Sequence, residues 1–194
     1  MDKLTRESLL PLETYSAIRN DFRAEVMAHK QNRRLALGTN ATLIFEDRLT
    51  MQYQVQEMLR IEKIFEADGI QEELDAYNPL IPDGSNWKAT FMVEFPEEEE
   101  RRAMLTRLIG IEEKVWVQIG DTDRVIPIAD EDLERADEEK TSAVHFLRFE
   151  LSASQVDALK SGADLAAGID HENYQVEVRS VAGNIRDSLV GDLD

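Results

Sequence analysis

The most constraining feature of this sequence is the shortness of the links between its strand-like segments. The stretch RLALGTNATLIFED holds two β-rich runs, residues 35–37 and Ala41–Glu46, with only the turn sequence GTN between them. Parallel neighbours need a crossover of roughly a dozen residues, so these runs can pair only as antiparallel strands. The segment KVWVQIGDTDRVIPIAD likewise predicts a hairpin around residues 120–123.

Helical periodicity dominates the first 80 residues outside these runs. Residues 12–32 repeat apolar side chains at three- and four-residue steps, the period of a helix. Residues 51–65 form a second amphipathic segment, for which Thr50 is the predicted N-cap. The Pro/Gly-rich stretch 79–86 is the best candidate for a boundary between a helical layer and the C-terminal half.

The C-terminal half mixes strands with short helices. Strands are predicted at WKATFMVEF, SAVHFLRFEL, DLAAGI and residues 174–178, and helices at EEEERRAMLTRLIG, SASQVDALKSG and the C-terminus. The acidic stretch DEDLERADEEK is predicted to be a solvated helix or loop. We therefore predict an α+β fold in which long N-terminal helices pack on a mixed or antiparallel sheet of about five strands. A single domain over residues 1–194 is expected.

Charge limits the classes of partner. The chain has 40 acidic and 22 basic residues, a net charge of -18, which repels nucleic acids and anionic membranes at long range but suits a basic protein partner. The most basic stretch, HKQNRR at residues 29–34, is predicted to complement the dipole at a helix end. No apolar run approaches the ~20 residues of a membrane span, and the N-terminus lacks a signal-peptide core. A cytoplasmic protein is therefore expected.

The sequence contains no catalytic or cofactor fingerprint. It has no cysteine, which excludes disulfides, thiolate metal sites and cysteine nucleophiles. A glycine-rich phosphate loop and a nucleophile elbow are also absent. We expect no bound cofactor, and the sequence leaves open whether the protein is an enzyme and whether it self-associates.

One carboxylate interrupts the apolar face of the helix MQYQVQEMLRIEKIF. On a helical wheel Glu62 lies near the centre of that face, and Gln54 lies between Ile61 and Phe65. If this face meets the sheet, Glu62 must be paired or protonated, because an isolated buried carboxylate costs several kcal/mol. We therefore expect Glu62 to turn inward and to find a partner.

The strand SAVHFLRFEL offers two partners for it. Alternation places His145 on an apolar face with Leu147 and Phe149, and Arg148 on the opposite face. Arg148 suits a carboxylate better, because its guanidinium can donate two parallel hydrogen bonds.

Several roles remain open for such a cluster. It could be a buried ion pair that fixes how the helix docks on the sheet. It could also be a pocket in which Arg148 or Arg60 holds an anion, while Glu62 or Gln54 orients that ligand.

Two further roles involve His145. Glu62, Glu57 and His145 could bind a metal, although the Glu-x-x-His pairs of di-iron proteins are absent. Alternatively, Glu62 and His145 could act as an acid–base pair. The candidate ligand-binding residues are Glu62, Arg148, His145, Gln54, Glu57 and Arg60.

The combination of LIFEDRLTMQYQVQEMLRIEKIF, LDAYNPLIP and SAVHFLRFEL resembles an uncharacterised bacterial family catalogued as domain of unknown function 3501. Genes of that family often lie beside a rubrerythrin and a heterodisulfide-reductase-like iron–sulfur protein. The resemblance thus implies an accessory role in an oxygen- or peroxide-linked redox system. The missing catalytic signature, the lack of cysteine and the acidic surface favour a non-enzymatic protein that binds a protein partner. The resemblance implies no catalytic residue. The alternative function is a small-molecule binding protein or enzyme with a pocket around Glu62, Arg148 and His145.

Overall fold

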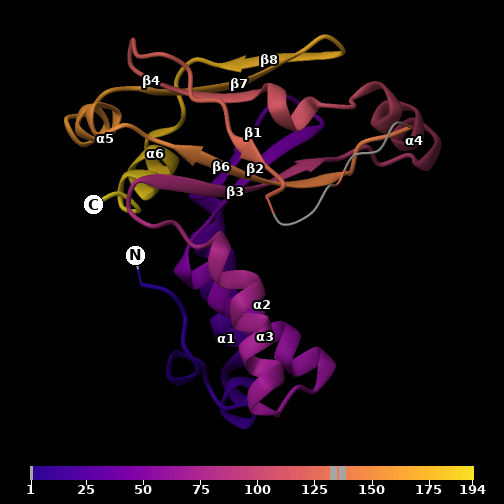
Figure 1. Cartoon of the computed structure of the whole chain (residues 1–194), viewed down its shortest axis with the longest axis vertical. Coiled ribbons are helices and arrows are strands. Elements are labelled where there is room, and N and C mark those ends of the chain that lie inside the picture. The colour runs from indigo at the N-terminus through magenta and orange to yellow at the C-terminus, as the bar shows by residue number, and fades with distance from the viewer. Residues whose placement is uncertain (1, 132–134, 136–138) are drawn as a thin grey trace.

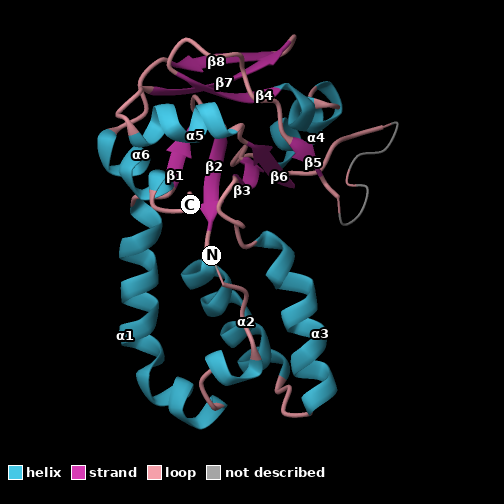
Figure 2. Ribbon diagram, turned by 60° about the vertical axis from the view of Figure 1, so that its left-hand side comes forward, coloured by secondary structure: helices cyan, strands magenta, loops and turns pink. Residues whose placement is uncertain are grey.

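The computed structural model describes residues 2–131, 135 and 139–194. Two antiparallel sheets face each other, and an arm of three helices extends away from them (Figures 1 and 2). The predicted α+β class with a five-stranded sheet is confirmed. None of the described helices combines the length and apolarity that a membrane span requires.

Every pairing between the described strands is antiparallel. The short links between β1 and β2 and between β7 and β8 require this arrangement. The larger sheet has the order β1-β2-β3-β6-β5, and the smaller has the order β4-β7-β8. The strand bounds are Arg34–Ala36 (β1), Ala41–Glu46 (β2), Asn86–Val93 (β3), Val115–Ile119 (β4), Ile128–Ala129 (β5), Val144–Glu150 (β6), Leu165–His171 (β7) and Tyr174–Val178 (β8). A single bridge between Val117 and Val125 closes the hairpin predicted around residues 120–123.

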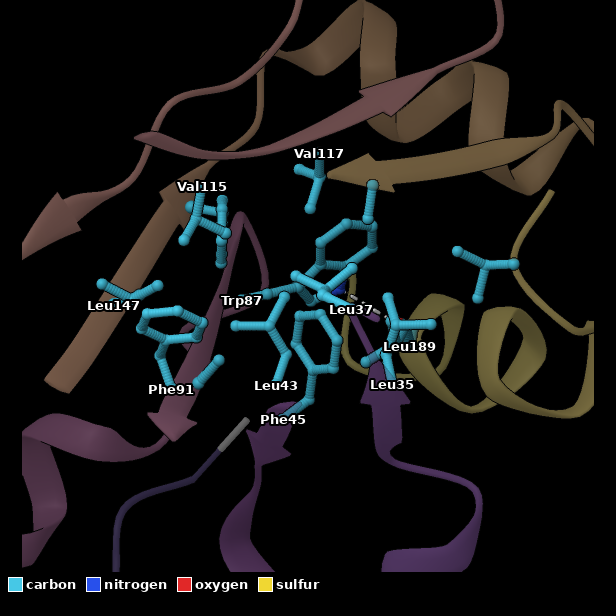
Figure 3. Close-up of a cluster of buried hydrophobic side chains, with 14 of the residues drawn as sticks. Leu35, Leu37, Leu43, Phe45, Trp87, Phe91, Val115, Val117, Leu147 and Leu189 are labelled. Atoms are coloured by element: carbon cyan, nitrogen blue, oxygen red, sulfur yellow. Dashed lines mark hydrogen bonds between the residues drawn. The ribbon is translucent and has the colours of Figure 1, made fainter. Parts of the chain in front are cut away.

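The main core fills the space between the two sheets. In Figure 3, Leu43, Phe45, Trp87 and Phe91 of the larger sheet point toward Val115 and Val117 of the smaller one. Trp87 is fully buried, and its indole nitrogen donates to the Leu189 carbonyl at 3.0 Å. Because side chains alternate along β3, the residues between these core positions project from the opposite, outer face of the sheet.

The helical arm has an apolar cluster of its own. Its helices are α1 (Leu12–Gln31), α2 (Arg48–Glu62) and α3 (Ala67–Tyr77), accompanied by the 3₁₀ turns η1 (Arg6–Ser8) and η2 (Asn78–Leu80). The buried members of this apolar cluster are Leu4, Met51, Val55, Leu59, Leu74 and Ile81. The apolar faces of the long helices therefore meet one another, and the arm joins the sheets at one end only (Figure 2).

The start of α2 differs from the prediction. Asp47, not Thr50, is the N-cap: its carboxylate accepts from the Thr50 backbone N–H at 2.9 Å. Thr50 occupies the third helical position, and its hydroxyl accepts from the Asp47 backbone N–H in return. This reciprocal capping box starts the helix earlier in the chain.

The remaining helices lie around the sandwich. They are α4 (Glu98–Arg107), η3 (Ile111–Lys114), α5 (Ala153–Lys160) and α6 (Gly183–Val190). Ser152 caps α5 as expected, and α5 and α6 both contribute to the main core. Most of the predicted acidic helix or loop, namely residues 132–134 and 136–138, lies outside the described residues. The single domain stays a prediction.

Candidate functional site

The expectation that Glu62 turns inward is wrong. Glu62 is exposed at the last position of α2, and the chain enters a left-handed conformation at Lys63. It makes no hydrogen bond or ion pair with Arg148, His145 or any other described residue. The helical wheel placed Glu62 on the apolar face of α2, but α2 extends away from the sheets. The end of α2 that carries Glu62 therefore lies far from both sheets (Figure 2).

Glu57 is the buried carboxylate of this helix. It accepts hydrogen bonds from the Tyr15 hydroxyl at 2.7 Å and from two nitrogens of Arg19 at 2.8 and 2.7 Å, with Arg60 at 3.4 Å. The hydrogen bonds from Arg19 lower the pKa of Glu57 to about 2, against the opposing effect of burial. This cluster fixes α1 to α2.

The predicted candidate Gln54 is not part of the cluster. Its half-buried side chain makes no hydrogen bond to any described residue.

His145 belongs to a separate buried network. Its Nδ1 lies 2.6 Å from Asp130 and its Nε2 lies 2.9 Å from the Thr141 hydroxyl, with Glu112 at 3.7 Å. The order hydroxyl–imidazole–carboxylate is that of a hydrolytic triad. However, His145 and Thr141 are 0% and 1% exposed, so a substrate cannot reach them. We assign the network the role of fastening neighbouring segments to β6.

Arg33 was missed by the sequence reasoning, which placed it among helix-end cations. It is 1% exposed, and its guanidinium contacts Asp192 at 2.5 Å, the Phe45 carbonyl at 2.9 Å and Asp47 at 3.4 Å. Burial raises the pKa of Asp192 despite this partner. Asp47 also lies 2.5 Å from His29, so the four side chains join the C-terminal segment to the end of α1 and the start of α2.

Arg148 lines a groove of about 670 Å³ at the root of the arm. The groove lies between the end of α3 with η2 and the outer face of β3 and β6. Its apolar wall is formed by Tyr77, Pro79, Leu80 and Phe146. The volume and the apolar lining are typical of sites for small organic molecules, which range over roughly 300–1,000 Å³.

Three cations and two carboxylates line this groove. Arg148 donates to both oxygens of Glu131 at 2.7 Å and also to Glu150, and these hydrogen bonds raise the pKa of the guanidinium. Lys3 donates to two backbone carbonyls, at 2.9 and 2.7 Å. The other carboxylate is Asp75.

Lys88 is the unusual member of the set. It lies directly opposite Arg148 in the β3–β6 register, and it is half-buried. It makes no hydrogen bond or ion pair with any described residue. Glu46 lies opposite Lys88 on β2; its Oε1 accepts from the Thr90 hydroxyl at 2.7 Å, and its Oε2 is buried without a hydrogen-bond partner among the described residues. Burial, and then the charge of Arg148, lower the pKa of Lys88.

The predicted candidates therefore do not form one site. Arg148 lines the groove, Glu57 and Arg60 bind each other within the arm, and His145 is sealed in the sheet region. No cluster of possible metal ligands occurs among the described residues. Lys88 could have been found from the sequence, because the alternation of WKATFMVEF places it opposite the core residues.

Comparison with known proteins agrees with the resemblance. The family model described as "Protein of unknown function (DUF3501)" matches residues 3–193. The chain belongs to this family. Its structure is similar to a crystal structure of a novel protein of unknown function from Burkholderia pseudomallei K96243, with 52% identity, a TM-score of 0.95 and 100% of both chains covered. No curated protein matches the chain.

Proposed function

We propose that this DUF3501 protein binds a small organic anion in the groove at the root of the arm. The charged head of the ligand would contact Lys88, and its apolar body would lie against Tyr77 and Phe146. The observation that carries the proposal is the state of Lys88: it is a half-buried cation that makes no hydrogen bond or ion pair with any described residue, in a chain of net charge -18.

Two unfavourable interactions in the empty groove would favour the binding of such a ligand. Two like charges directly opposite on neighbouring strands destabilise a sheet, and partial burial of an ammonium disfavours its charged form. An anionic head beside Lys88 would relieve both effects.

The chemical class is tested by calorimetric titration with three ligands that share an octyl chain. We expect octanesulfonate to bind, octanol to bind more weakly and octyltrimethylammonium not to bind. Because the three share their apolar body, the comparison isolates the charge. Equal affinity for all three, or preference for the cation, would contradict the proposal.

The expectations from the family resemblance are separate from this site. The accessory role beside redox proteins, cytoplasmic localisation and self-association stay predictions. Binding of a protein partner is supported by a different part of the molecule, the far end of the arm.

A further inference from the structure

A second groove, of about 590 Å³, lies at the end of the arm that is far from the sheets. The segment before α1, the end of α2 and the start of α3 form its walls. Its apolar lining includes Leu9, Leu10, Leu12, Leu59, Ile64 and Ile70. Phe65, at its edge, is 69% exposed, and nearby Ile61 is 60% exposed. Exposed apolar side chains gathered around an apolar groove are typical of a protein-binding surface.

Acidic residues outnumber basic ones in the chain segment from the end of α2 through α3, although the exposed Lys63 lies between Glu62 and Glu66. Helix α3 carries four carboxylates and no basic residue, and Glu62 and Glu66 precede it. Burial and the neighbouring charges of Glu62 and Glu72 raise the pKa of Glu73, which shows that these carboxylates repel one another. Arg6 and Glu7 on the facing wall have opposite charges.

We infer that the tip of the arm docks a basic amphipathic segment of a partner protein, with apolar side chains in the groove and Lys or Arg beside Glu62 and Glu73. Charge complementarity decides the occupant. A second copy of this chain would bring two acidic tips together and would add to the repulsion between molecules of net charge -18. The inference does not depend on the anion groove, which lies at the other end of the arm.

The test uses a photocrosslinking amino acid, benzoylphenylalanine, in place of Phe65 in the full chain, expressed in cells that make the protein naturally. A second protein carries it at Ile126, which is 53% exposed and lies outside the arm. We expect position 65 to crosslink efficiently to a segment with net positive charge, identified by peptide mass spectrometry, and position 126 not to do so.

Charge reversal supplies the matched comparison. Glu62→Lys should lower the yield at position 65 by about tenfold, because like charges would then face each other. Glu62 is exposed, so this variant should fold normally. Glu98→Lys in α4, also exposed, should leave the yield unchanged. Crosslinks to another copy of the chain, or to an acidic or neutral segment, would overturn the inference. It would also be overturned by equal crosslinking yields from positions 65 and 126, or by a yield at position 65 that Glu62→Lys leaves unchanged.

Discussion

Lys88 and Arg148 lie directly opposite each other on β3 and β6, and both side chains line the groove at the root of the arm. Arg148 is neutralised by Glu131 and Glu150, whereas Lys88 makes no ion pair with a described residue. We expect the half-buried ammonium of Lys88 to cost stability in the empty protein, because burial and the charge of Arg148 act against it more strongly than the charges of Glu131 and Glu150 favour it. Residues that bind ligands often carry such a cost, because their interactions are completed only on binding.

The first prediction concerns that cost. Lys88→Met removes the charge while nearly keeping the side-chain length, and it should raise the free energy of unfolding by about 0.5 kcal/mol. Arg148→Met should lower it, because Glu131 and Glu150 lose their donor. Urea denaturation measures both changes. If Lys88→Met instead destabilises the protein, Lys88 has a structural partner and the strain argument fails.

The second prediction concerns pH. An anion binds the charged form of Lys88, so affinity for octanesulfonate should fall as pH rises through the pKa of Lys88, which lies below the ordinary 10.5. The groove carboxylates and Arg148 keep their charges over this range, but the pKa of Lys3 is lowered too, mainly by burial. The titration should therefore use a Lys3→Arg background. In the Lys3→Arg background, Lys88→Arg should move the loss of octanesulfonate affinity to higher pH. An unchanged pH profile would exclude Lys88 as the group that causes the loss.

The third prediction compares two glutamates of α2. The pKa of Glu57 is depressed to about 2 from 4.5, so its contribution to stability is present above pH 4.5 and is lost as the pH falls from 4.5 toward 2. Glu57→Gln should lower the free energy of unfolding at pH 7 by about 2 kcal/mol and weaken this acid dependence. Glu62 is exposed, so Glu62→Gln should change the free energy of unfolding at pH 7 by no more than about 0.5 kcal/mol. An equal loss of stability in Glu57→Gln and Glu62→Gln would contradict the assignment of Glu57 as buried and Glu62 as exposed.

The fourth prediction concerns the network that joins the C-terminus to the arm. Arg33→Met leaves Asp192 buried without its cation and should cost about 3 kcal/mol or more. The adjacent Arg34 is 60% exposed at its side chain and pairs loosely with Glu94, so Arg34→Met should cost less than about 1 kcal/mol. Thermal unfolding of the two variants makes the comparison, and a similar loss in both would contradict the assigned burial.

Local patterns were sufficient to predict much of the fold. The turn sequence between residues 37 and 41 forced β1 and β2 to be antiparallel, and the helix predicted at SASQVDALKSG is α5. Alternation also placed His145 correctly among the core positions of β6. These features depend on residues close together in the chain, where periodicity and capping determine the outcome.

The candidate site was less predictable because it depends on long-range packing. A wheel gives the angle of Glu62 but not what lies opposite, and here α2 packs on α1 and α3 beyond the reach of the sheets. The contact between Arg33 and Asp192 spans 159 positions and has no local signal. Arg148 was selected for its pairing chemistry. Alternation along β3 could have placed Lys88 on the outer face of the sheet, but its position opposite Arg148 depends on the long-range register of β3 and β6.

Calorimetric titration of octanesulfonate into the Lys88→Met variant tests the anion groove most directly. The matched control is Lys160→Met, which removes the same charge at an exposed position in the last turn of α5. Loss of a charge-assisted contact should weaken binding to Lys88→Met by about tenfold or more, while Lys160→Met should bind like the unmodified protein. Equal affinity of the two variants would contradict the proposed site.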